Sequence, residues 1–245
     1  MPQNFSRATV PNDSKTKRIL VVDIGGSNVK LMISAEEKRR KFPSGPKLEP
    51  PEAIAQIKEN TRDWDFDAVA VGFPAPIREG KILCDPTHLG NGWEGFDFVK
   101  ALGKPTRVIN DAALQALGSY RGGGRMLFLG LGTGLGSALV WQDHLFPLEL
   151  GHLPYVDEGI IEDVLGDEGL EELGRKEWQR ETLRAIRFLK QALIADYVIL
   201  GGGNAKLLDK LPDDVELGHN RNVYPGGLRL WETHPETKKP RWQIV

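Results

Sequence analysis

The chain of 245 residues has a single cysteine, Cys84. One cysteine excludes an intramolecular disulfide and every zinc site that is built from several cysteines. No run of about 18 apolar residues occurs, and residues 1–17 are polar and lack the apolar core of a signal peptide. These absences predict a cytoplasmic protein that does not span a membrane, with residues 1–17 as a disordered N-terminal arm.

The chain also lacks a charge excess of either sign. Its net charge is −2 and its isoelectric point lies near 6.2, so a broad basic surface for nucleic acid or anionic lipid is not expected. The apolar fraction of 40% and the charged fraction of 27% are ordinary for a folded protein. We therefore expect no nucleic-acid or membrane partner, and local groups must hold any phosphate.

Two segments share one plan, an apolar strand, a glycine turn and a second apolar strand. Residues 18–34 contain the turn Gly25-Gly26-Ser27-Asn28, and residues 127–141 contain a turn built on Gly132, Thr133 and Gly134. Both segments are predicted to form β-hairpins. Glycine in such turns lets backbone N–H groups approach a phosphate closely, although a hairpin can also need glycine for its geometry alone.

The rest of the chain alternates helical and strand patterns, which indicates an α/β protein with mixed sheets. Asn110 is expected to cap a helix that ends at the glycines 122–124, and Asn204 to cap a short helix after the turn 201–203. We divide the chain into an N-terminal lobe over 18–120 and a C-terminal lobe over 121–245. The other expected elements are a helix near 51–62, strands 68–73, 106–109 and 197–200, a polar loop over 146–167, and helices near 168–195.

Two familiar phosphate motifs are absent from the sequence. Leu135 stands where the third glycine of a dinucleotide fingerprint belongs, and a strand-like run follows it instead of a helix. The Gly-Lys pairs at 80–81 and 103–104 are not followed by Ser or Thr, which excludes a P-loop.

Several short motifs occur together in a family order. They are DIGGSNVK at 23–30, GFPAPI at 72–77, the region of Asn91 and Trp93, VINDA at 108–112, LGLGTGLGSAL at 129–139, ELGHLPY at 149–155 and VILGGGNAKLL at 198–208. The combination resembles the ROK family of sugar kinases, particularly its polyphosphate glucokinase branch, within the superfamily of sugar kinases, heat-shock proteins and actin. The resemblance implies two actin-like lobes with a cleft between them.

The resemblance also implies roles for the acceptor side of the cleft. Asp111 would take the proton of the sugar hydroxyl, and its place in the first turn of a helix should favour the ionised carboxylate. Asn110, Glu149 and His152 would bind sugar hydroxyls. Glu162 would be a further sugar ligand, although the cysteine-rich zinc loop that precedes it in many relatives is missing here.

On the donor side, the resemblance implies that Asp23 holds Mg²⁺ through water, whereas Gly130 stands at the equivalent place in the second hairpin. Lys30 is either a phosphate contact or a solvated strand residue. The expected phosphate and nucleotide ligands are Gly25, Gly26, Ser27, Asn28, Lys30, Gly132, Thr133, Gly134, Gly202, Gly203 and Asn204.

We therefore expect a kinase that phosphorylates a hexose, glucose at the 6-position first, with Mg²⁺, with ATP or polyphosphate as donor, and without zinc. The resemblance further implies a homodimer. The alternative is a sensor of the same fold that binds a sugar or nucleotide without turnover. Such a sensor is expected to lose Asp23 or Asp111, and both are present.

Overall fold

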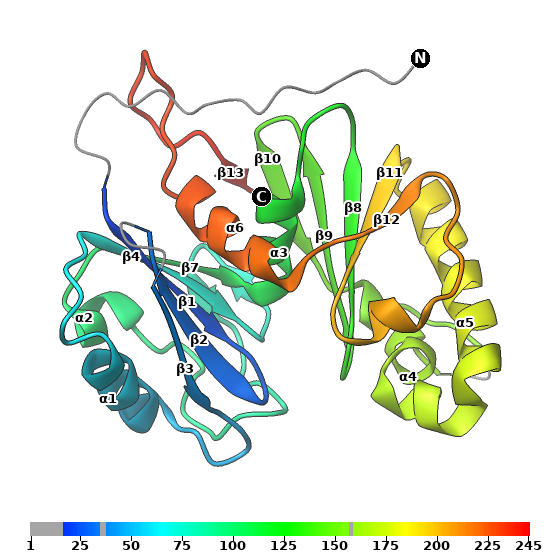
Figure 1. Ribbon diagram of the computed structural model, residues 1–245, viewed down its shortest axis with the longest axis horizontal. Helices are drawn as coiled ribbons and strands as arrows, with labels where there is room; N and C mark the ends of the chain where they lie inside the picture. Colours follow the sequence, from blue (N-terminus) through cyan, green and yellow to red (C-terminus); the bar gives the residue numbers. More distant parts are fainter. Residues whose placement is uncertain (1–16, 35–37, 157–158) are drawn as a thin grey trace.

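The computed structural model describes residues 17–34, 38–156 and 159–245. The predicted N-terminal arm therefore lies outside the described residues, except for Lys17. The chain forms two mixed β-sheets with helices between them and on their outer faces (Figure 1). Within the described part, no helix combines the length and the apolar character that a membrane crossing requires.

The first sheet has the order β3-β2-β1-β4-β7. β1 and β2 form the predicted antiparallel hairpin, and β1, β4 and β7 run parallel. All residues of β1 and β4 are buried, as expected for strands covered on both faces. The strands are β1 (Ile19–Ile24), β2 (Asn28–Ile33), β3 (Arg39–Pro43), β4 (Ala68–Phe73) and β7 (Thr106–Asn110).

The second sheet has the order β12-β11-β8-β9-β10-β13 and repeats the plan of the first. β8 and β9 form the second predicted hairpin, and β11 and β12 continue parallel to β8. A separate two-stranded hairpin consists of β5 (Ile77–Arg78) and β6 (Lys81–Ile82). The strands of the second sheet are β8 (Met126–Leu131), β9 (Leu135–Trp141), β10 (His144–Leu148), β11 (Tyr197–Gly201), β12 (Val215–Leu217) and β13 (Gln243–Ile244).

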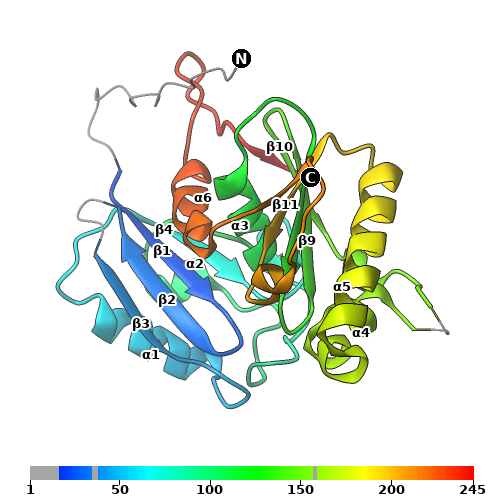
Figure 2. The same cartoon turned by 45° about the vertical axis from the view of Figure 1, so that its right-hand side comes forward.

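The helices form three layers around the sheets (Figures 1 and 2). α1 (Pro50–Asn60) and α2 (Phe98–Leu102) share a core with the outer face of the first sheet. α4 (Ile161–Leu165) and α5 (Asp167–Ala192) do so on the second sheet, and α5 bends at Gly174, where φ is 69°. α3 (Asp111–Ser119) and α6 (Val223–Arg229) lie between the sheets in a third core cluster.

Glycine makes the contact between α3 and α6 close. A Cβ on Gly118 would lie 1.7 Å from the carbonyl oxygen of Asn222, and a Cβ on Gly226 would lie 1.9 Å from that of Leu114. α6 also packs against β1, so the chain returns to the first sheet after crossing the second. The division into lobes at residue 120 stays a prediction, and residues of α6 pack across it.

Three predictions of local structure are wrong. The segment 146–167 is not a loop, because it contains the end of β10, the 3₁₀ helix Leu150–His152 and α4. Ser137 on β9 organises this segment, since its hydroxyl donates to the carbonyl oxygen of Leu148 and accepts from the N–H of Leu150. The helix after Asn110 ends at Ser119, before the glycines 122–124.

The third error concerns Asn204. The short helix after the turn 201–203 is capped by Gly203 without a side-chain hydrogen bond. The Asn204 amide instead donates to Asp167 Oδ1 at 2.7 Å, because a stronger carboxylate acceptor lies beside it at the start of α5.

Candidate active site

A cavity of about 410 Å³ lies where the two glycine turns, the start of α3 and the segment after β10 meet. Its lining comes from both sheets, so the cavity is a cleft between them. Eleven of the predicted site residues line it: Gly26, Ser27, Asn110, Asp111, Gly132, Thr133, Gly134, Glu149, His152, Glu162 and Gly202. The others, which the lining does not include, are Asp23, Gly25, Asn28, Lys30, Gly203 and Asn204.

The junction between β7, which ends at Asn110, and α3, which begins at Asp111, lies at the cleft. Asn110 caps the helix as predicted, with Oδ1 accepting from Ala112 N at 2.9 Å and from Ala113 N at 3.2 Å. Its amide nitrogen donates to the carbonyl oxygen of Ala75 at 3.4 Å. Asn110 therefore fixes the start of the helix that presents Asp111, and its sugar contact stays a prediction.

Burial, together with the charges of Asp23 and Glu149, raises the pKa of Asp111 to about 7. The hydrogen bond from Ala112 N–H and the charge of Lys30 oppose the shift. The expectation that the helix start keeps this carboxyl ionised is therefore wrong, because burial and like charges outweigh the helix N-terminus. A carboxyl that titrates near neutral pH is better suited to accept a proton from a hydroxyl.

Asp23 and Lys30 form an ion pair across the first hairpin. The two residues are register partners in β1 and β2, and the distance between Lys30 Nζ and Asp23 Oδ2 is 2.9 Å. The Asp23 side chain is 5% exposed. Burial lowers the pKa of Lys30, but its charge interaction and hydrogen bond with Asp23 outweigh burial and raise it overall. Lys30 is thus held by Asp23 while its side chain is 43% exposed, and its contact with a phosphate stays a prediction.

Three side chains gather at the opposite wall of the cleft. Burial raises the pKa of Glu149, the charge of His152 opposes this, and the charge of Glu162 adds to it. Glu162 reaches the second glycine turn, where Oε2 accepts from Leu135 N at 2.8 Å. A Cβ on Gly134 would lie 2.2 Å from that oxygen, so a larger residue at this position would displace the Glu162 carboxylate. The missing cysteine-rich loop therefore does not keep Glu162 from the cleft.

The glycine turns are closed by their own backbone. Gly25 N donates to the carbonyl oxygen of Asn28 at 3.1 Å, and Gly132 N to that of Gly134 at 3.2 Å. In the third turn Gly202 has a φ of 83°, and a Cβ there would lie 1.9 Å from the carbonyl oxygen of Leu131. The third turn therefore packs on the end of β8, beside the second turn.

Sequence reasoning missed several lining residues. Gln115 follows Asp111 by four residues, a spacing that places both on one face of α3, so helical periodicity could have found it. Thr87 and His88 come from the irregular segment between β6 and α2, for which the sequence carries no periodic signal. Among the described residues, no group of three or more His, Cys, Asp or Glu side chains is arranged to hold a metal ion.

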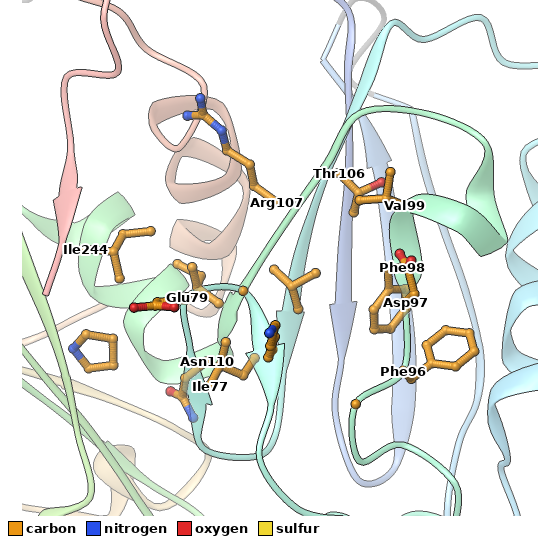
Figure 3. Close-up of a pocket in the computed structure, with 16 residues that line it drawn as sticks. Ile77, Glu79, Phe96, Asp97, Phe98, Val99, Thr106, Arg107, Asn110 and Ile244 are labelled. Carbon is orange, nitrogen blue, oxygen red and sulfur yellow. The ribbon is translucent and has the colours of Figure 1, made fainter.

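A second, larger cavity of about 570 Å³ lies beside β7 (Figure 3). Phe96 and Phe98 line it, and Asn110 belongs to the lining of both cavities. Arg107 extends from the same strand to the C-terminal segment, where its guanidinium donates to the carbonyl oxygen of Leu230 and lies 4.4 Å from the ring centroid of Trp231. The glycine turns and Asp111 are absent from this lining, so we assign the chemistry to the cleft.

The chain is similar in sequence to known proteins. The family model described as "ROK family" matches residues 19–161. A polyphosphate glucokinase of Mycobacterium tuberculosis is 25% identical over 238 residues, which cover 85% of each chain. The alignment thus spans both sheets.

Solved structures agree with the fold. An inorganic polyphosphate/ATP-glucomannokinase from Arthrobacter sp. strain KM has a TM-score of 0.71 at 23% identity, and the match covers 86% of this chain and 97% of the other. A ROK family glucokinase from Streptomyces griseus, in complex with glucose and AMPPNP, has a TM-score of 0.68 at 17% identity. The match covers 85% of this chain and 97% of the glucokinase. The predicted actin-like α/β fold with mixed sheets is therefore confirmed. Since the family model covers more than half of a chain whose two sheets and glycine turns follow the same plan, the chain belongs to the ROK family.

Proposed function

We propose that the chain is a sugar kinase that transfers a phosphoryl group from ATP or polyphosphate to a hexose, glucose at the 6-hydroxyl first. One observation carries the proposal, namely a cleft that joins two glycine turns to a carboxyl with a pKa of about 7. The turns supply backbone donors for phosphate, and the carboxyl supplies a proton acceptor. The relatives named as polyphosphate glucokinase and glucomannokinase support the same reaction.

In this reaction the sugar hydroxyl oxygen forms a bond to the terminal phosphorus while the bond to the donor oxygen breaks. Asp111 orients the hydroxyl and receives its proton as transfer proceeds. Glu149, His152 and Glu162 bind the other hydroxyls of the ring, and Gly26 and Ser27 face the group that is transferred. Gly132, Thr133 and Gly134 hold the rest of the donor, and Gly202 lies beside them.

The residues present fit a magnesium ion that is held largely by water. Mg²⁺ commonly keeps several water ligands and uses only one or two protein carboxylates. Asp23 has one oxygen engaged by Lys30, which leaves the other for a bound water. Asp23 would hold the ion beside the first turn, and the ion would neutralise charge on the donor phosphates.

The absence of zinc, the cytoplasmic location and the homodimer stay predictions that follow from the sequence and the resemblance. The second candidate is a sensor of the same fold. It would bind the same ligands as the kinase but would not transfer the phosphoryl group. The retained Asp111, with a pKa suited to proton transfer, favours the kinase.

A substrate panel tests the proposal. Purified protein with Mg²⁺ is assayed against glucose, mannose, fructose and galactose, each with ATP and with polyphosphate, and sugar phosphates are identified by ³¹P NMR. We expect glucose 6-phosphate from at least one donor. Glucose binding without any phosphorylated product would support the sensor, and product formation without a hexose acceptor would reveal a hydrolase.

A further inference from the structure

The segment between β6 and α2 forms a tightly built loop at the edge of the cleft. The carboxylate of Asp85 accepts backbone hydrogen bonds from Gly92 at 3.2 Å, Trp93 at 2.6 Å and Glu94 at 3.0 Å. These bonds lower the pKa of Asp85, so the carboxylate stays charged and keeps them. The loop is thereby closed at its base.

The core of the first sheet holds the same loop from below. Leu89 is 5% exposed and Trp93 is fully buried. The N–H of Gly90 and the indole N–H of Trp93 both donate to the carbonyl oxygen of Leu48, at 3.0 and 3.2 Å. A loop fixed in this way holds the exposed side chain of His88 in a defined place.

That place is the first glycine turn. A Cβ on Gly26 would lie 3.1 Å from the Cβ and 3.7 Å from the Cγ of His88, so the histidine packs directly over the turn. His88 lines the cleft together with Gly26, Ser27 and Asp111. Within the described part of the chain, its imidazole has no hydrogen-bond partner, which leaves its N–H groups available to a ligand.

The cleft is lined by more acidic than basic side chains, which makes a basic group near the phosphate important. Asp85, Asp111, Glu149 and Glu162 line the cleft, and a phosphate chain that enters adds more negative charge. Among the residues that the structure describes, His88 and His152 are the basic side chains in the lining. His152 lies near Glu149 at the sugar wall, and Lys30 is paired with Asp23. Of the two basic side chains in the lining, His88 is the one that lies beside the first glycine turn.

We propose that His88 is a catalytic residue that donates a hydrogen bond to the phosphoryl group as it passes from donor to sugar. The inference rests on the proposed function and adds a residue to its machinery. No proton is transferred by His88, since the sugar proton goes to Asp111. An imidazole can donate in either protonation state, and a fixed donor aimed at developing charge stabilises the transition state more than the ground state.

Three variants test the proposal in the full-length protein. In His88→Ala we expect kcat to fall by about 10- to 100-fold with glucose KM changed less than about 3-fold, the pattern of a lost transition-state donor. His88→Gln keeps an N–H donor and should stay within about 10-fold of the unaltered protein. His234→Ala is the matched control, because His234 is absent from the cleft lining, and its kinetics should not change.

Two kinetic results would overturn the proposal. One is an unchanged kcat in His88→Ala, and the other is a rise in glucose KM with kcat preserved, which would make His88 a sugar ligand. Because His88 is exposed, melting temperatures of the variants should match that of the unaltered protein, so a loss of rate cannot be mistaken for unfolding.

Calorimetric titration with magnesium pyrophosphate gives a readout that does not need turnover. We expect His88→Ala to weaken pyrophosphate binding by about 10-fold, and His234→Ala to leave it unchanged. If no hexose is phosphorylated but this difference is found, the proposed function fails while the phosphate contact stands. Equal pyrophosphate affinity in the two variants would overturn the contact itself.

Discussion

At the scale of single residues, the environment of Asp111 disfavours the carboxylate form that its proposed role requires. Its carboxyl is partly buried at the cleft and interacts with the charges of Asp23 and Glu149, which disfavours its charged form. Proton transfer nevertheless needs the charged form. The N–H of Ala112 and the ammonium of Lys30 offset part of this cost, so the pKa settles near 7.

The activity should therefore depend on pH. Below pH 7 Asp111 is protonated and cannot accept the proton of the sugar, so kcat/KM should fall about tenfold for each pH unit there and level off above it. A pH profile of glucose phosphorylation at saturating donor checks this expectation. A profile that stays flat between pH 5 and 8 would contradict it.

The same shift predicts a stability gain in Asp111→Asn. A carboxyl whose pKa rises from 3.8 to about 7 on folding costs stability as the pH rises through that window, because the folded state must release a proton that it retains more strongly. At pH 8 the variant should unfold with a free energy higher by up to about 4 kcal/mol, less where cleft water solvates the carboxylate. Near pH 4 the difference should vanish. Urea unfolding at both pH values measures it, and an Asn variant less stable at pH 8 would argue against a raised pKa.

At the scale of secondary structure elements, two close contacts at glycines set the position of α3. α3 meets α6 through Gly118 and Gly226, and it meets β9 where a Cβ on Gly136 would lie 2.7 Å from the Cβ of Ala112. The backbone of α3 is thereby held between the C-terminal helix and the second hairpin. Its first residue, Asp111, then points into the cleft.

Gly226→Ala should disrupt this arrangement. The new methyl group would overlap the carbonyl oxygen of Leu114, so α6 must shift, at a cost of about 2 kcal/mol or more. Gly203→Ala is the matched control, because a Cβ there meets no atom within 4 Å and φ is −69°. Thermal unfolding should show a lower melting temperature only for Gly226→Ala. Equal melting temperatures would mean that the helices do not pack this closely.

These elements also show what the sequence could and could not predict. The hairpins, the cap at Asn110 and the parallel strands follow from local patterns of apolar residues, glycine and asparagine, which report on nearby chain geometry. The Asp23–Lys30 pair and the contact of Glu162 with Leu135 depend on strand register and on segments 27 residues apart, which local patterns do not contain. The turn at residues 148–150 depends on the hydroxyl of Ser137 in β9, a contact that the sequence of the segment 146–167 does not contain.

At the scale of the whole molecule, the C-terminal segment connects the two sheets. β13 pairs with β10 in the second sheet, whereas Trp231 donates from its indole to the carbonyl oxygen of Val69 in the first, at 3.3 Å. The guanidinium carbon of Arg107 lies 4.4 Å from the Trp231 ring centroid, and Lys17 Nζ lies 5.2 Å from it. One ring thus holds together parts of the chain that are distant in sequence.

Trp231→Ala should weaken this connection. The loss of a half-buried indole, its hydrogen bond and its cation contacts is expected to lower the free energy of unfolding by about 2–3 kcal/mol. Trp141→Ala serves as the control, because that indole is 40% exposed and has one cation contact, with Arg125. Denaturant titration compares the two variants, and an equal loss in both would remove Trp231 from its connecting role.

The role of Asp111 is tested by the single-turnover rate of glucose phosphorylation in Asp111→Asn, measured beside glucose affinity in the same preparation. We expect a rate lower by about 10² or more with a glucose dissociation constant changed less than about 3-fold, in a protein no less stable than the original. A rate equal to that of the unaltered chain would contradict the assignment of the cleft carboxyl as the proton acceptor of phosphoryl transfer.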